Sequence, residues 1–132
     1  MMNRDISSRL SVRIYKQRPI EQEKLDAILQ SAILAPSAKN IQPWRFVVVQ
    51  QDKVLINSIS SLVKHSTFIK TADCLICVFL DKDSAFDRTK DCQSIGACIE
   101  NMLLTATSLG IGSCWIGEIL ERQTEVKELL QI

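Results

Sequence analysis

The stretch RTKDCQSIGACIENMLLTATSL, residues 88–109, decides the fold because it holds the clearest amphipathic pattern in the chain. Its apolar side chains recur at intervals of three and four residues, which places them on one stripe of an α-helix. This stripe consists of Ile95, Cys98, Ile99, Met102, Leu103 and Ala106. Gly110 follows directly and can end the helix. The pattern predicts a long helix at the centre of the core.

Two apolar segments before this helix predict strands buried within a sheet. Residues 46–49 are a short β-branched run, and Cys74–Leu80 reads CLICVFL, apolar on both alternating faces. Between these segments, Asp52 can cap a helix that carries one apolar stripe. Residues 21–35 predict an earlier helix, which opens with acidic side chains and stops before Pro36.

The order of the predicted elements indicates the class of fold. Residues 111–116 predict a third strand and residues 120–130 a last amphipathic helix. Helices and strands then alternate along the chain without repeats or long linkers, which is typical of an α+β or α/β sandwich. With 132 residues and 46% hydrophobic content, the chain is expected to form one domain.

Charge and hydropathy argue against two classes of partner. The chain has sixteen Lys and Arg residues and fifteen Asp and Glu residues, so its net charge is close to zero. No long-range electrostatic field therefore favours binding to nucleic acid or to an anionic membrane. No apolar run approaches the roughly 20 residues of a membrane helix, and the N-terminus has no apolar signal region. We therefore expect a cytoplasmic protein that binds neither nucleic acid nor a membrane.

Five cysteines are an odd number, and most of them lie in apolar segments. Reduced and mostly buried thiols are expected. A metal or iron–sulfur site would have to use Cys74, Cys77, Cys92 and Cys98. The first two lie three residues apart in a predicted strand and point to opposite faces, which disfavours such a site. His65, the only histidine, is expected at the surface near a helix end.

Residues 9–13, RLSVR, alternate polar and apolar side chains. An extended backbone would point Arg9, Ser11 and Arg13 to one side. Two guanidinium groups around a hydroxyl can clamp a phosphate through charge-assisted hydrogen bonds. A solvated, charged strand edge is the simpler interpretation of the pentapeptide taken alone.

Two later segments combine residue types that suit a flat polar ligand. Residues 35–44, APSAKNIQPW, form a loop stiffened by two prolines, with Ser, Asn and Gln side chains free to hydrogen-bond. The alternative is a rigid loop with Trp44 packed in the core, which we prefer for Trp44 itself. Residues 110–117, GIGSCWIG, carry glycines that permit close backbone approach, and a plain tight turn is the alternative.

Taken together, these segments resemble the FMN-dependent nitroreductase family. The family has an Arg-x-Ser-x-Arg motif, a Pro-Ser-x-x-Asn-x-Gln-Pro-Trp loop, and a long helix followed by a Gly-Leu-Gly-Ser-x-Trp turn. Residues 9–13, 36–44, 101–104 and 110–117 match these motifs in order. The resemblance implies an α/β/α sandwich whose mixed, mostly antiparallel central sheet is flanked by helices.

The resemblance also implies that each FMN site is shared by the two subunits of a homodimer. Arg9, Ser11 and Arg13 would hold the phosphate and ribityl chain, with the backbone of Leu10 close by. The residues that would contact the same flavin from the other subunit are Pro36, Ser37, Ala38 and Asn40.

Trp115, Ile116 and Gly117 would lie beside the isoalloxazine ring, where a backbone N–H can bond N5. The implied reaction passes a hydride from NADH or NADPH through the flavin to a nitroaromatic, a quinone or a similar small acceptor. The flavin carries this chemistry, so no catalytic side chain is assigned.

Family members usually continue past the last predicted helix into another strand and a basic tail, whereas this sequence stops at Ile132. The expectation is a 1–132 domain that lacks this strand, exposes an apolar sheet edge and retains FMN weakly. A flavin-binding or interaction protein of the same fold without turnover is the alternative function.

Overall fold

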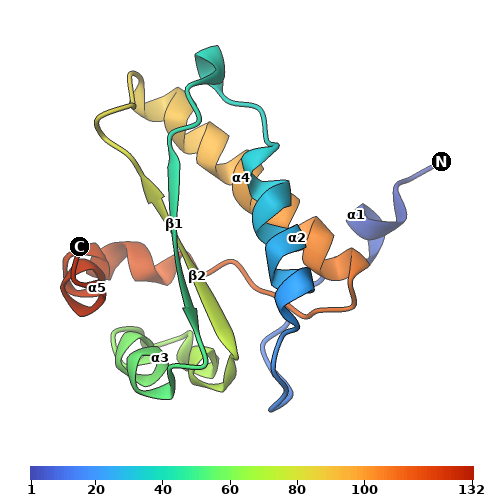
Figure 1. Ribbon diagram of the computed structural model, residues 1–132, viewed down its shortest axis with the longest axis vertical. Helices are drawn as coiled ribbons and strands as arrows, with labels where there is room; N and C mark the ends of the chain where they lie inside the picture. The colour runs from blue at the N-terminus through green and yellow to red at the C-terminus, as the bar shows by residue number, and fades with distance from the viewer.

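The computed structural model describes residues 1–132, and Figure 1 shows how its helices surround a pair of strands. The α-helices are α1 (Arg4–Ser8), α2 (Gln22–Ile33), α3 (Lys53–Ser60), α4 (Arg88–Ser108) and α5 (Gln123–Leu130). Three short 3₁₀ helices are η1 (Ala38–Asn40), η2 (Thr67–Thr71) and η3 (Glu118–Arg122). The strands are β1 (Trp44–Gln50) and β2 (Cys74–Leu80). None of these helices is both long and apolar enough to span a membrane.

The two strands form an antiparallel ribbon at the centre of the molecule. Trp44 pairs with Leu80 at one end and Gln50 pairs with Cys74 at the other. In Figure 1 the ribbon runs between α2 and α4 on one side and α3 and α5 on the other. Because side chains alternate along a strand, the ribbon can bury a separate set of residues toward each layer.

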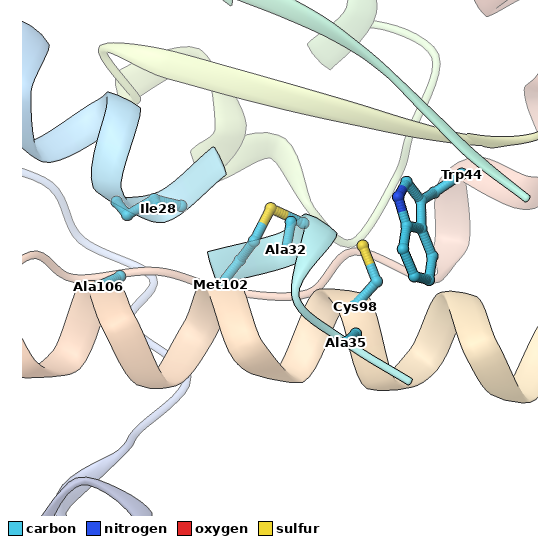
Figure 2. Close-up of a cluster of buried hydrophobic side chains, with 7 residues drawn as sticks. All are labelled: Ile28, Ala32, Ala35, Trp44, Cys98, Met102 and Ala106. Carbon is cyan, nitrogen blue, oxygen red and sulfur yellow. The ribbon is translucent and has the colours of Figure 1, made fainter. Parts of the chain in front are cut away.

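The larger core fills the space between the ribbon, α2 and α4. Figure 2 shows its buried members, which are Ile28, Ala32, Ala35, Trp44, Cys98, Met102 and Ala106. Phe46 and Val78 of the strands pack against this cluster. Small alanines on α2 and α4 let the two helices approach closely, while Trp44 closes one end. The predictions that Trp44 lies in the core and that residues 88–109 form its central helix are confirmed.

The smaller core lies on the other face of the ribbon. Val49 of β1 is buried with Ile56 and Ile59 of α3. Val47, Leu75 and Leu129 pack around them, so α5 also contributes to this layer. The predicted α+β fold with an α/β/α sandwich is thereby confirmed, with helices on both faces of an antiparallel ribbon.

The prediction of a third strand at residues 111–116 is wrong. Only Ser113 pairs with another segment, through a single parallel bridge to Ser11. A strand needs a neighbour along its length, and these residues form no hydrogen-bonded pairing with β1 or β2. We call residues 110–117 the strap, since they run as irregular backbone from the end of α4 toward η3.

The cysteine prediction is half correct. All five thiols are free, but only Cys98 is fully buried, and Cys92 is exposed. The strands are covered by one layer of helices on each side and carry no further strands at their edges, which leaves Cys74 and Cys77 partly accessible. No three His, Cys, Asp or Glu side chains converge in a way that could hold a metal ion.

A buried carboxylate organises the start of α4. Asp87 caps the helix by accepting a hydrogen bond from the Lys90 N–H at 2.9 Å. Asp91 is only 1% exposed, and its Oδ2 accepts from the N–H groups of Phe86 and Asp87, both at 2.9 Å. Asp91 therefore fixes the turn that leads into α4.

Replacing Asp91 by alanine should lower the free energy of unfolding by about 2–4 kcal/mol, because two backbone N–H groups lose their acceptor. Asp91→Asn should cost less, since the amide oxygen still accepts. Urea denaturation of both variants measures this difference. The control is Asp83→Ala, at an exposed site in the segment before α4. This substitution should change the free energy of unfolding by no more than about 0.5 kcal/mol. Equal unfolding midpoints for Asp91→Ala and Asp83→Ala would refute the role of Asp91.

Candidate functional site

The outer face of α4 forms the floor of the candidate site. At 3.6 residues per turn, Gly96, Glu100 and Leu103 fall on the face opposite Cys98 and Met102, which point into the core. A Cβ placed on Gly96 would lie 3.6 Å from the Trp115 ring, in ordinary van der Waals contact. Trp115 of the strap therefore lies directly over α4.

The strap is joined to the N-terminal segment that follows α1. The Val12 N–H donates to the Ser113 carbonyl at 2.9 Å, and Ser11 and Ser113 form the parallel bridge. Gly112 makes this approach possible, because a Cβ there would lie 2.9 Å from Cγ1 of Val12. The extended backbone predicted for residues 9–13 is thus held in place by the strap.

These three segments enclose a pocket of about 440 Å³. It is lined by Ile6, Arg9, Ser11, Glu100, Leu103, Ser113, Cys114 and Trp115. Its size lies within the usual range for small-molecule and cofactor sites, roughly 300–1,000 Å³. The pocket combines a guanidinium, hydroxyl groups, a carboxylate and an indole.

Three of the predicted site residues line this pocket together, namely Arg9, Ser11 and Trp115. Their neighbours Leu10, Arg13, Ile116 and Gly117 lie in the same two segments but outside the lining. Sequence reasoning missed the other five lining residues. The helical period of residues 88–109 could have indicated Glu100, which falls on the face that the core stripe leaves free. Leu103 was predicted to belong to the core stripe, but it is only partly buried and lines the pocket instead.

The charged groups that line the pocket balance, since Arg9 is its one cation and Glu100 its one anion. Arg9 Nε lies 3.8 Å from Glu100 Oε1, and the two side chains are 34% and 46% exposed, so water screens this pair. Arg13, a second cation two residues further along the same segment as Ser11, does not line the pocket. Burial, with a smaller contribution from Cys114, raises the pKa of Tyr15 to about 12 although Arg13 lowers it. Tyr15 is therefore a neutral phenol at physiological pH.

The predicted loop at residues 36–40 lies elsewhere on the chain. The Ala38 N–H donates to Ser94 Oγ at 3.3 Å, and Ser94 belongs to the buried face of α4 rather than to the pocket face. Within one chain, Pro36, Ser37, Ala38 and Asn40 do not line the pocket formed by Arg9, Ser11 and Trp115.

The same loop has a strained backbone. Lys39, Asn40 and Gln42 all have positive φ angles, of 54°, 54° and 55°. Such conformations cost non-glycine residues about 1–3 kcal/mol each and persist where neighbouring contacts enforce them. Here Ser37 Oγ accepts from the Gln42 N–H at 2.9 Å, and the Gln42 amide bonds the Asn40 side chain. The polar groups of the loop therefore hold one another in a fixed arrangement.

Glu118 anchors the far end of the strap. Its carboxylate accepts from the Lys64 N–H at 2.6 Å and from the His65 N–H at 3.1 Å, which ties η3 to the loop after α3. Partial removal from water raises the pKa of Glu118, but these backbone hydrogen bonds together lower it by more, so it lies below its ordinary value. His65 itself is exposed, as predicted.

Comparison with known proteins identifies the family. The profile described as the Nitroreductase family matches residues 6–66 and 58–132. A protein of Archaeoglobus fulgidus, provisionally named NADH dehydrogenase/NAD(P)H nitroreductase, is 39% identical over 130 residues, which cover 96% of this chain and 74% of that protein. The chain belongs to the nitroreductase family, and this prediction is confirmed.

Solved structures agree with this assignment. A nitroreductase, provisionally so named, from Desulfovibrio desulfuricans was solved in complex with FMN, and it superposes with a TM-score of 0.94 at 32% sequence identity. The match covers 100% of this chain and 78% of the D. desulfuricans chain. An FMN-dependent nitroreductase from Clostridium difficile superposes with a TM-score of 0.85 at 31% sequence identity. This match covers 96% of the present chain and 76% of the C. difficile chain. The chain thus spans about three quarters of these relatives' length.

Gly112→Ala should destabilise the contact between the strap and residues 9–13. The added Cβ would clash with the stiff, β-branched side chain of Val12, and such overpacking costs about 1–3 kcal/mol. Gly117→Ala is the matched control, because no atom lies within 4 Å of its Cβ and its φ of −83° suits alanine. Urea denaturation should separate the two variants. Equal losses of stability in both would show that the close approach at Gly112 is unimportant.

Acidification should release the Glu118 anchor. A carboxylate whose pKa is lowered by folding stabilises the fold above its ordinary pKa of 4.5, and this contribution disappears as pH falls through the lowered value. The amide resonances of Lys64 and His65 should therefore titrate below pH 4.5 in ¹H–¹⁵N NMR spectra. Glu118→Gln should abolish this titration, whereas Glu128→Gln, at an exposed site on α5, should preserve it. A titration that survives Glu118→Gln would assign it to another group.

Proposed function

We propose that residues 1–132 form one FMN-binding domain that acts as a homodimer and passes a hydride from NADH or NADPH to a nitroaromatic, quinone or similar acceptor. The single observation that carries the proposal is the pocket between α4, residues 9–13 and the strap. Arg9 and Ser11, the proposed phosphate-binding residues, line this pocket together with the aromatic side chain of Trp115.

The enzyme class follows from the family. Relatives are named as NAD(P)H nitroreductases and as an FMN reductase of Bacillus subtilis, and the D. desulfuricans structure contains FMN. The chain is therefore an FMN-dependent NAD(P)H oxidoreductase. When bound, FMN supplies the hydride chemistry, and the protein supplies binding, orientation and exclusion of water.

The residues of the pocket fit the phosphate end of such a cofactor. Arg9 and Ser11 line it with a guanidinium and a hydroxyl, and Arg13 lies two residues further along the same extended segment. Guanidinium groups bind phosphate through bidentate, charge-assisted hydrogen bonds. Glu100 opposes this role, since it pairs with Arg9 at 3.8 Å. We expect Arg9 to turn from Glu100 to the phosphate when the cofactor binds.

The strap is the proposed support of the ring end. Trp115 is 51% exposed at the rim of the pocket, although it packs on Gly96 below. A large aromatic side chain at such a rim can exclude water from one side of a flat ligand. The backbone of Ile116 and Gly117 continues from it with free N–H groups that can face the ring.

A second subunit is proposed to complete the site. The loop at residues 36–40 is rigid and polar but lies away from the pocket of its own chain. Ile6, which lines the pocket, is exposed, and so are Leu10 and Ile14 of the following segment; pairing of two copies would cover such apolar surface. The five free thiols suit the reducing cytoplasm, where we place the protein.

The phosphate role is tested by comparing FMN with riboflavin, which lacks the phosphate. Arg9→Gln should weaken FMN binding about tenfold or more but leave riboflavin binding nearly unchanged. Glu100→Gln should tighten FMN binding, because it removes the carboxylate that competes for Arg9. Flavin fluorescence quenching measures both affinities. The same loss for FMN and riboflavin in Arg9→Gln would refute the phosphate role, and an FMN complex that NAD(P)H fails to bleach would refute the redox function.

A further inference from the structure

A second pocket, of about 150 Å³, lies where the segment before α2 meets the ends of β1 and β2. Its lining is Lys16, Gln17, Arg18, Pro19, Lys53, Thr71 and Asp73. In Figure 1 the blue loop that leads into α2 comes near the lower end of the strand ribbon in this region. None of these residues belongs to the flavin site described above.

Hydrogen bonds hold the walls of this pocket. The Ile20 N–H donates to Asp73 Oδ2 at 2.9 Å, and the Gln50 side chain donates to the Ile20 carbonyl at 3.2 Å. On the opposite wall, Lys53 Nζ donates to the Ala72 carbonyl at 3.1 Å. The loop and the strand ends therefore keep a fixed separation without a ligand.

The charges of the pocket are unbalanced. Lys16, Arg18 and Lys53 face one carboxylate, that of Asp73, and three cations against one anion leave a local charge of +2. No carboxylate lies within 4.0 Å of the three cationic groups, since the ion pairs of the chain involve other residues. This concentration stands out in a chain whose net charge is +1. A dianion would relieve the repulsion between the cations.

The size and donors of the pocket select the ligand. About 150 Å³ equals the space of roughly five water molecules, which suits the five heavy atoms of a phosphate group but not a nucleoside. Lys16, Arg18 and the remaining Lys53 protons can donate to its oxygens, as can the Gln17 amide. Thr71 contributes no donor, because its hydroxyl already donates to the Phe68 carbonyl at 2.7 Å.

We propose that this pocket binds a phosphate dianion, separately from the clamp at residues 9–13. Two sources share this chemistry: free inorganic phosphate, and the phosphate monoester that distinguishes NADPH from NADH. The second source rests on the proposed function.

The binding test is an NMR titration of the full chain with inorganic phosphate in a chloride buffer. Saturable shifts are expected at the amides of residues 16–18, 53 and 71–73, both without FMN and with FMN filling the first pocket. Arg18→Gln and Lys16→Gln should each raise the Kd about tenfold or more. Lys127→Gln removes the same charge from an exposed site on α5 and should leave the Kd within about twofold.

Shifts confined to residues 9–13, or equal weakening in all three variants, would overturn the proposal. Steady-state kinetics then distinguish the sources. A rise in KM for NADPH alone in Arg18→Gln assigns the pocket to the coenzyme phosphate, whereas unchanged KM values for NADPH and NADH assign it to free phosphate. The NMR titration with inorganic phosphate does not require flavin. A chain that fails to bind FMN would therefore refute the proposed function, but the phosphate titration would still test the second pocket.

Discussion

The packing of α4 on two sides is the constraint on which the rest of the structure depends. Its inner face places Cys98 and Met102 against α2 and the strands, and its outer face places Gly96 and Glu100 beneath the strap. Trp115 lies against this outer face at Gly96. One helix therefore sets both the core and the floor of the candidate site, so changes in its packing also reach that site.

The sequence predicts those elements that are determined by local apolar periodicity. The bounds of β2 and α4 agree with the prediction to within one residue, because each carries its own pattern of burial. The strand predicted at residues 111–116 fails for the opposite reason. Its residues are apolar enough for a strand, but a strand also needs a partner, and Ser113 meets only Ser11. A short stretch of sequence does not show whether a distant segment will pair with it as a neighbouring strand.

The candidate site divides in the same way. Arg9, Ser11 and Trp115 were indicated by motifs, and the fold brings them to one pocket. Ser113 and Cys114 could not be assigned, because their place in the lining depends on how the strap crosses α4. The loop at residues 36–40 also matches a motif, yet its distance from the pocket follows from Ala38 bonding Ser94 on the inner side of α4. A motif specifies chemistry more reliably than location.

The pocket draws its lining from residues 6–11, 100–103 and 113–115, which are far apart along the chain. Closing so large a loop costs conformational entropy that only the completed α4 and strap can offset. During synthesis the N-terminal wall therefore emerges long before its opposite wall exists. A ligand that binds only the assembled pocket would therefore stabilise the folded state by holding these distant segments together.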